Sequence, residues 1–327
     1  MRPMKRFLHA IAALLLGAGS MLASAADYPT RPILLVVPFP AGGPADSIGR
    51  YIGKVISEQL GQPVVVDNRA GAGGVIGLNN VAKAKPDGYT LGIGSISNMA
   101  INVTLMKSMP YDARKDFAPI TNGGLTTGII LASSAAPFKD IPGMLAYAKA
   151  NPGQLTYATA GVGSVGHMVG TALEQRTGVK LTHIPYKGTG PAAQDLLAGV
   201  VPLFFETSLA TAKQHMNGGR IKLLAVTRKE RSRELPNVPS MGELGYPEID
   251  SPAWFGLVGP TGLPPEIIKR LNEVVTARLR EPSVVDNFSL FGAEPAPTSP
   301  AEFGKYIDSE ITRWGAVIKA ANITEEK

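Results

Sequence analysis

The sequence offers few side chains that could carry out covalent or metal chemistry. It has no cysteine, so thiol nucleophiles and thiolate metal sites are excluded. Three of its histidines follow the N-terminal segment, at positions 167, 183 and 215, and their separations match no metal-ligand motif. Ser164 and His167 could act as a nucleophile and a general base, but a capping or packing histidine is the simpler interpretation. The sequence therefore predicts no metal site, and it leaves a Ser164/His167 centre as an alternative.

Four loops could instead bind an anion through their backbone. Each follows a short apolar run and precedes a longer stretch with helical character. Unpaired N–H groups at a helix N-terminus point outward, the helix dipole favours negative charge there, and glycine lets a ligand approach the backbone closely. We therefore expect a small anion, either a carboxylate or a phosphate. In chain order these loops, named loops one to four, are Phe39–Gly43, Gly94–Asn98, Ala160–Ser164 and Glu206–Ser208.

Loop three also fits a nucleotide-binding pattern. Gly161, Gly163 and Gly166 match G-x-G-x-x-G after a candidate strand. The dinucleotide fingerprint also needs an acidic residue about 20 positions further on, yet no Asp or Glu lies between Gly178 and Gly190. The phosphate-binding sequence G-x-x-x-x-G-K-[ST] does not occur either. Nucleotide binding is therefore disfavoured, and no cofactor is expected.

Alternating strands and helices must position these loops. Short apolar, β-branched runs recur between Gly and Pro, and amphipathic stretches follow them, which predicts an α/β fold with mostly parallel sheets covered on both faces. The expected strands are Ile33–Val37, Val64–Val66, Thr90–Ile93, Ile129–Leu131, Leu155–Ala158, Leu181–Ile184, Leu203–Phe205, Leu223–Val226 and Gly256–Val258. The expected helices are Pro44–Leu60, Gly74–Lys83, Ile141–Ala150, Val165–Thr177, Pro191–Ala198, Leu209–Asn217, Pro265–Leu279 and Pro300–Ala320.

The N-terminal segment has the pattern of a secretory signal peptide. Arg2, Lys5 and Arg6 precede an apolar run, Phe7–Leu22, and the small residues Ala23–Ala25 follow it. A membrane anchor needs about 20 apolar residues, and this run is shorter. We expect export and cleavage near residue 25. Loss of the three basic residues lowers the formal net charge from +6 to +3, and no basic stripe for nucleic acid remains.

Chain length and the order of several motifs point to one family. The 327 residues exceed the size at which a single core usually splits, roughly 250–300 residues, so two lobes are expected. Several long segments closely resemble the Bug family, the periplasmic solute receptors of tripartite tricarboxylate transporters, and the resemblance covers essentially the whole mature chain. These segments are Pro38–Asp46, Val65–Gly74, Tyr157–Ser164, Pro185–Ala192, Leu235–Ser240 and Trp254–Gly256.

The resemblance implies a two-lobed type II periplasmic-binding-protein-like α/β fold with a ligand cleft between the lobes. Residues 1–25 would form the signal peptide, 26–126 and 249–327 lobe 1, and 127–248 lobe 2. The family binds small organic carboxylates, closes on them and delivers them to integral membrane permease subunits, and some members present the ligand to a sensor kinase. We expect a monomer with no cofactor, metal, nucleic acid or catalytic activity. A periplasmic enzyme that acts on a carboxylate through Ser164 and His167 is the alternative.

The family pattern also implies which residues contact the ligand. Ala41–Gly43 and Gly161–Ser164 would hold one carboxylate, partly through ordered waters, and Lys187 is a secondary candidate. Ser97–Met99 replaces a Thr-His pair that many members carry. Glu206 stands where Asp is usual, and it could receive a ligand ammonium group or bond a neighbouring helix end. The expected ligand-binding residues are Phe39, Ala41, Gly42, Gly43, Ser95, Asn98, Ala160, Gly161, Gly163, Ser164, His167, Glu206 and Ser208.

Overall fold

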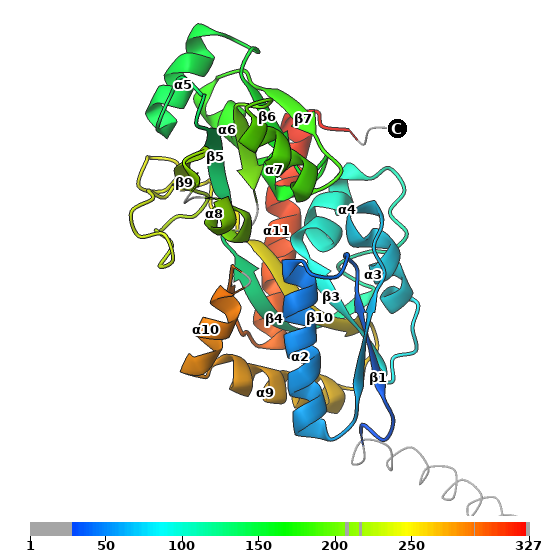
Figure 1. Cartoon of the computed structure of the whole chain (residues 1–327). Helices are drawn as coiled ribbons and strands as arrows, with labels where there is room; N and C mark the ends of the chain where they lie inside the picture. Colours follow the sequence, from blue (N-terminus) through cyan, green and yellow to red (C-terminus); the bar gives the residue numbers. More distant parts are fainter. Residues whose placement is uncertain (1–27, 207–208, 216–217, 291, 325–327) are drawn as a thin grey trace, which may run out of the picture.

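Two β-sheets organise the chain. The computed structural model describes residues 28–206, 209–215, 218–290 and 292–324. Its strands are β1 (Ile33–Val37), β2 (Val64–Asn68), β3 (Thr90–Ser95), β4 (Phe117–Thr126), β5 (Ile129–Ser133), β6 (Thr156–Thr159), β7 (Thr182–Pro185), β8 (Leu203–Glu206), β9 (Ile221–Val226), β10 (Ala253–Pro260) and β11 (Ala293–Pro295). One sheet has the order β11-β4-β10-β3-β1-β2, and the other the order β7-β6-β8-β5-β9. We call the first sheet with its helices lobe 1, and the second with its helices lobe 2 (Figure 1).

Helices surround both sheets. They are α2 (Pro44–Leu60), η2 (Ala72–Gly74), α3 (Val75–Ala82), the π-helical turn η3 (Ser97–Ile101), α4 (Asn102–Leu105), α5 (Ile141–Ala150), α6 (Val165–Thr177), α7 (Thr189–Ala198), α8 (Leu209–His215), α9 (Pro265–Leu279), α10 (Pro282–Ser289) and α11 (Pro300–Ala320). The predicted bounds of α2, α5, α6, α9 and α11 are confirmed. Their ends carry the strongest local signals, such as the Ser299–Glu302 capping box of α11 and the left-handed Gly178 after α6.

The sheets are mixed, so the expectation of mostly parallel sheets was wrong. Parallel pairs join β1 to β2 and β3, and β6 to β7 and β8. Antiparallel pairs join β10 to β3 and β4, β11 to β4, and β5 to β8 and β9. β4 leads out of lobe 1 and β10 leads back into it. These two strands lie side by side and therefore run in opposite directions.

The longest strand, β4, was not predicted from the sequence. It contains Pro119 and the pair Gly123–Gly124, which locally are typical of loops. The glycines are required by packing, because a Cβ on Gly123 would lie 2.6 Å from Cδ1 of Ile52 in α2, and one on Gly124 would lie 2.8 Å from Cε1 of Phe288 in α10. Close approach of two helices to this strand thus explains residues that look like a turn. β11, α10, η3 and α4 are short and were missed as well.

Two chain segments connect the lobes. β4 ends at Thr126 and β5 begins at Ile129, and the chain returns to lobe 1 between β9 and β10. Arg228, two residues after β9, lies 3.4 Å from Asp250 and 3.9 Å from Glu294 of β11, and it donates to Oγ1 of Thr127. A single guanidinium therefore contacts both connecting segments and an edge strand of lobe 1.

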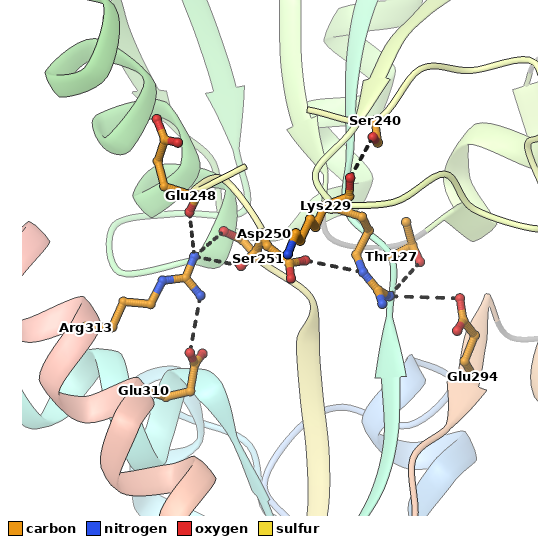
Figure 2. A network of polar contacts seen from close by, with 10 residues as sticks. Thr127, Lys229, Ser240, Glu248, Asp250, Ser251, Glu294, Glu310 and Arg313 are labelled. Atoms are coloured by element: carbon orange, nitrogen blue, oxygen red, sulfur yellow. Dashed lines mark hydrogen bonds and ion pairs between the residues drawn. The ribbon is translucent and has the colours of Figure 1, made fainter. Parts of the chain in front are cut away.

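The long helix α11 also contacts both lobes (Figure 1). It packs on β4 in lobe 1 and on α6 in lobe 2, where Gln175 donates to the carbonyl oxygen of Val317. Arg313 of α11 donates to the carbonyl oxygens of Glu248 and Asp250 at 3.0 and 2.6 Å, so it fixes the returning segment against lobe 1 (Figure 2). Within the described ranges, no helix is long and apolar enough to cross a membrane.

Candidate ligand-binding site

A cleft of about 990 Å³ lies where loops from the two lobes meet. Both lobes contribute to its walls, and the residues lining it within the described part of the chain include one charged side chain, Lys187, and no carboxylate. The lining residues are Phe39, Pro40, Ala41, Gly42, Gly43, Pro44, Ala45, Ala72, Gly73, Ser95, Ile96, Ser97, Asn102, Leu105, Met106, Ala160, Gly161, Val162, Gly163, Ser164, Val165, Pro185, Tyr186, Lys187, Gly188, Thr189, Ala253 and Phe255.

Loop one is held in place by a buried carboxylate at the start of α2. Asp46 accepts the N–H of Gly42 at 2.9 Å, a side-chain hydrogen bond from Arg50 at 2.9 Å and one from Asn68 at 2.9 Å. Asn68 also donates to the carbonyl oxygen of Phe39. Burial of Asp46 opposes its ionisation, but the hydrogen bonds from Arg50, Gly42 and Asn68 outweigh it and lower the pKa of the carboxyl group. Asp46 therefore holds loop one in place through these hydrogen bonds.

The hydrogen bond from Gly42 to Asp46 decides which N–H groups of loop one remain available to a ligand. The Gly42 N–H is occupied by Asp46, so it is not one of the free donors that the sequence suggested. The N–H groups of Ala41, Gly43 and Ala45 have no acceptor among the described residues, and all three residues line the cleft. Pro44 at the first position of α2 has no N–H to satisfy. Loop one thus keeps free donors on residues that line the cleft.

Loop three has a similar division between occupied and free donors. The Gly161 N–H donates to Oγ1 of Thr159 at 3.1 Å, and the Gly163 N–H donates to Nδ1 of His167 at 3.3 Å. Val162 and Val165 line the cleft, and their N–H groups find no acceptor within the described residues. Two free donors at the N-terminus of α6 therefore complement those of loop one.

Ser164 caps α6. Its Oγ accepts the backbone N–H of His167 at 3.3 Å, and its own N–H donates to the carbonyl oxygen of Gly161. The residue also lines the cleft. Its hydroxyl is thus engaged in helix capping at the edge of the site.

Loop two contributes an unpaired hydroxyl. Ser95 lines the cleft with 1% of its surface exposed, and its Oγ has no partner among the described atoms. Oδ1 of Asn98 accepts the Ser95 N–H at 2.8 Å, while Tyr111 donates to the carbonyl oxygen of Asn98. Buried polar atoms normally have partners. The Ser95 hydroxyl is therefore a candidate for ligand binding, and Asn98 supports it from behind.

The structure places the expected residues in three groups. Asn98, His167 and Glu206 are buried and do not line the cleft, so they lie behind its wall. Ser208 of loop four lies outside the described residues. The expected residues that line the cleft are Phe39, Ala41, Gly42, Gly43, Ser95, Ala160, Gly161, Gly163 and Ser164.

Sequence reasoning missed the wall formed by α4, and in the turn before α7 it named only Lys187, as a secondary candidate. Asn102, Leu105 and Met106 line the cleft from lobe 1, and Tyr186 and Lys187 line it from lobe 2. Burial and a hydrogen bond to a carboxylate raise the pKa of the Tyr186 hydroxyl to about 12. Lys187 is exposed. The Tyr-Lys-Gly turn was a usable signal for Lys187, but no local pattern indicated the residues of α4.

Comparison with known proteins identifies the family. Residues 48–323 match the tripartite tricarboxylate transporter family receptor, TctC. The chain belongs to this family. Protein BugT of Bordetella pertussis (strain Tohama I) is 38% identical over 318 residues, which cover 97% of each chain. The resemblance to the Bug family is thereby confirmed.

Solved structures extend the similarity of this TctC receptor to its fold. An R. palustris protein solved with adipate is 36% identical, with a TM-score of 0.82 over 91% of this chain and 99% of its own. MatC from Rhodopseudomonas palustris with bound malate is 32% identical, with a TM-score of 0.77 over 89% of this chain and 100% of its own. The two-lobed fold expected from the sequence is confirmed.

The Ser164/His167 pair of the TctC receptor has the geometry of a cap and not of a catalytic centre. Nδ1 of His167 already accepts the Gly163 N–H, and the Ser164 hydroxyl accepts a backbone N–H. Burial lowers the pKa of His167 to about 4. A general base works best with a pKa near the operating pH, so this imidazole is poorly suited to remove a proton at neutral pH.

Proposed function

We propose that this TctC receptor binds a small organic carboxylate in the cleft and delivers it to the membrane subunits of a tripartite tricarboxylate transporter. The observation that carries this proposal is the chemistry of the cleft lining. The residues that line the cleft include several with free backbone N–H groups, Ser95 with its unpaired hydroxyl, and the cation Lys187, and no carboxylate among the described residues. A cleft with donors and without acidic groups attracts an anion.

One carboxylate group would lie between the two lobes. The free N–H groups of Ala41 and Gly43 belong to lobe 1, and those of Val162 and Val165 belong to lobe 2. An anion that bridges them makes its full set of hydrogen bonds only when the lobes are close together. Binding therefore favours the closed arrangement through differential affinity. A membrane partner can distinguish that arrangement from the open one.

The remainder of the ligand would be acidic or neutral and free of an ammonium group. Glu206 is buried behind the wall and does not line the cleft, which disfavours its role as an ammonium acceptor. Lys187 can attract a second carboxylate, and Leu105, Met106 and Phe255 offer apolar contact to a carbon chain. Adipate and malate, named for the two structural relatives, are both dicarboxylates, which supports a dicarboxylate here.

The proposal also includes export of the chain to the periplasm. Residues 1–25 would direct the chain to the periplasm and be removed near Ala25. Lobe 1 would comprise residues 26–126 and 249–327, and lobe 2 residues 127–248, which agrees with the passage from β4 to β5 and the return into β10. Sequencing the N-terminus of the protein recovered from the periplasm checks the cleavage position. The expected first residue lies within a few positions of Ala26.

A ligand screen tests the binding function. The mature chain is mixed with malate, adipate, succinate and tricarboxylates, and its thermal unfolding and calorimetric binding are measured. A bound acid stabilises the folded protein by RT ln(1 + [L]/Kd), about 2.7 kcal/mol at a hundredfold excess over Kd. Aspartate, which replaces the malate hydroxyl with an ammonium group, should bind more weakly than malate.

Two results would contradict the proposal. If no carboxylate stabilises the folded protein while neutral analogues do, the ligand class is wrong. If the bound acid is recovered chemically changed in proportion to protein and time, the Ser164/His167 enzyme is the better description. Native mass spectrometry of freshly purified protein identifies any acid that co-purifies.

A further inference from the structure

Two histidine rings are stacked directly beneath loop three. The ring centroids of His167 in α6 and His183 in β7 are 4.0 Å apart, with an angle of 10° between their planes. His167 is buried, with 8% of its surface exposed, and neither histidine lines the cleft. Tyr157 of β6 also stacks on His183, with ring centroids 5.1 Å apart. His183 of β7 thus contacts rings from both β6 and α6.

Each histidine holds a different residue next to the ligand loop. Nδ1 of His167 accepts the N–H of Gly163, which fixes the middle of loop three. Nε2 of His183 lies 2.6 Å from Oγ1 of Thr159, and that hydroxyl oxygen accepts the N–H of Gly161. His167 thereby occupies the Gly163 N–H directly, and His183 contacts the Thr159 hydroxyl that occupies the Gly161 N–H. The N–H groups of Val162, between these glycines, and of Val165, after them, have no acceptor among the described residues.

The surroundings of the pair favour the uncharged rings. Burial lowers the pKa of His167 to about 4, and burial together with the charge of His167 lowers the pKa of His183 to about 3. Tyr157 faces His183, and burial followed by the charge of Glu174 in α6 raises the pKa of its phenol, so it also stays neutral. Glu206 of β8, on the next strand of the sheet, is not among the causes of either histidine shift.

We propose that His167 and His183 are positioning residues for the ligand: their stacked rings hold loop three in the conformation that leaves the Val162 and Val165 N–H groups free for the anion. This inference rests on the proposed carboxylate binding. It requires an unprotonated Nδ1 on His167, because a proton there would face the Gly163 N–H donor to donor. His167 is therefore the Nε2–H tautomer.

Matched substitutions separate this role from simple packing. An asparagine oxygen can occupy the position of Nδ1 of histidine, and a glutamine amide can occupy the position of Nε2. His167→Asn and His183→Gln therefore keep the polar contacts, whereas His167→Leu and His183→Phe fill space without them. We expect His167→Leu and His183→Phe to raise Kd for the tightest acid of the screen about tenfold at pH 7, and the polar variants to stay within about threefold of wild type.

Two further measurements report on loop three itself. Thr159→Val removes the hydroxyl that joins His183 to Gly161, so it should weaken binding as His183→Phe does, and the double variant should lose little more. Nitrogen-15 NMR of the intact protein should show His167 as the Nε2–H tautomer at pH 7. This readout also applies if one of the apolar variants does not fold.

The outcomes distinguish this inference from the proposed function. If the wild-type protein binds no carboxylate, the proposed function fails and the inference fails with it. If wild type binds an acid but His167→Leu and His183→Phe bind it as tightly, only the positioning role is overturned. An Nδ1–H tautomer for His167 would overturn it as well. Weak binding by the apolar variants with rescue by their polar counterparts supports it.

Discussion

Replacing Gly163 with alanine tests whether loop three meets lobe 1 across the cleft. Gly163 has φ +74°, and a Cβ there would lie 2.6 Å from Cδ2 of Leu105 and 3.2 Å from Oδ1 of Asn102. Both neighbours belong to α4 in lobe 1. The added methyl group therefore opposes the approach of the two lobes that ligand binding favours.

The substitution has two separable costs. An alanine with left-handed φ costs roughly 1–2 kcal/mol. This cost applies whether the lobes are apart or together, so it lowers the free energy of unfolding and leaves Kd unchanged. The contact with Leu105 can be relieved by turning that side chain from its preferred rotamer, at about 0.5–1.5 kcal/mol. This second cost arises only when the lobes are together, and it should raise Kd by roughly 2- to 12-fold.

Gly178→Ala is the matched control. Gly178 ends α6 in the same lobe with φ +72°, and a Cβ there meets no atom within 4 Å. Urea unfolding measures the free energy of unfolding, and calorimetry measures Kd for the acid found in the screen. Both variants should lose similar stability, but only Gly163→Ala should bind more weakly. Equal binding by the two variants would show that Gly163 does not limit closure, and the reasoning would be refuted.

Three other predictions follow from the charged groups. Lys187→Gln should weaken binding of a dicarboxylate about two- to fivefold at low salt and make Kd less dependent on salt. Lys180 is an exposed lysine of the same lobe, and Lys180→Gln should change neither. Equal effects of the two substitutions in calorimetry would show that Lys187 is not part of the site. Arg313→Met should lower the free energy of unfolding by about 1–3 kcal/mol, because the carbonyl groups of residues 248 and 250 lose their donor. A urea midpoint unchanged from wild type would contradict this prediction. Because burial lowers the pKa of His167 to about 4 and that of His183 to about 3, the unfolded chain binds more protons below its histidine pKa of about 6.5. The free energy of unfolding should therefore be greatest above pH 7 and decline as the pH falls from 6.5 toward 4, and this decline should be smaller in His183→Gln. A urea midpoint that does not change over that pH range would refute the burial argument.

Local sequence signals predicted the helices better than the sheets. Pro44 and Gly61 bound α2, and Ser164 and Gly178 bound α6, because capping and left-handed glycine are decided within one turn of the chain. The direction of a strand relative to its neighbour is set by how the chain crosses between lobes. That is why the sheets were expected to be mostly parallel, whereas β4 was missed because its Pro119 and Gly123–Gly124 locally are typical of loops.

In the candidate site too, local sequence signals predicted some features and the tertiary fold decided others. Glycine-rich loops before helices predicted loops one and three, and both line the cleft. The choice of donors within those loops depended on partners far away in sequence, such as Asn68 for loop one and His183 for loop three. α4 lines the cleft because lobe 1 faces lobe 2 there, and its own sequence contains no sign of this.

By itself, the sequence determined the family, the order of most strands and helices, the export signal as an expectation, and the loops able to bind an anion. These depend on residue types and on neighbours within a few positions. The tertiary structure alone decided which N–H groups remain free, that Glu206 lies behind the wall, and that Lys187 is the charged residue of the described cleft lining. The physical reason is that hydrogen-bond satisfaction and burial depend on atoms brought together by folding, and these atoms come from both lobes.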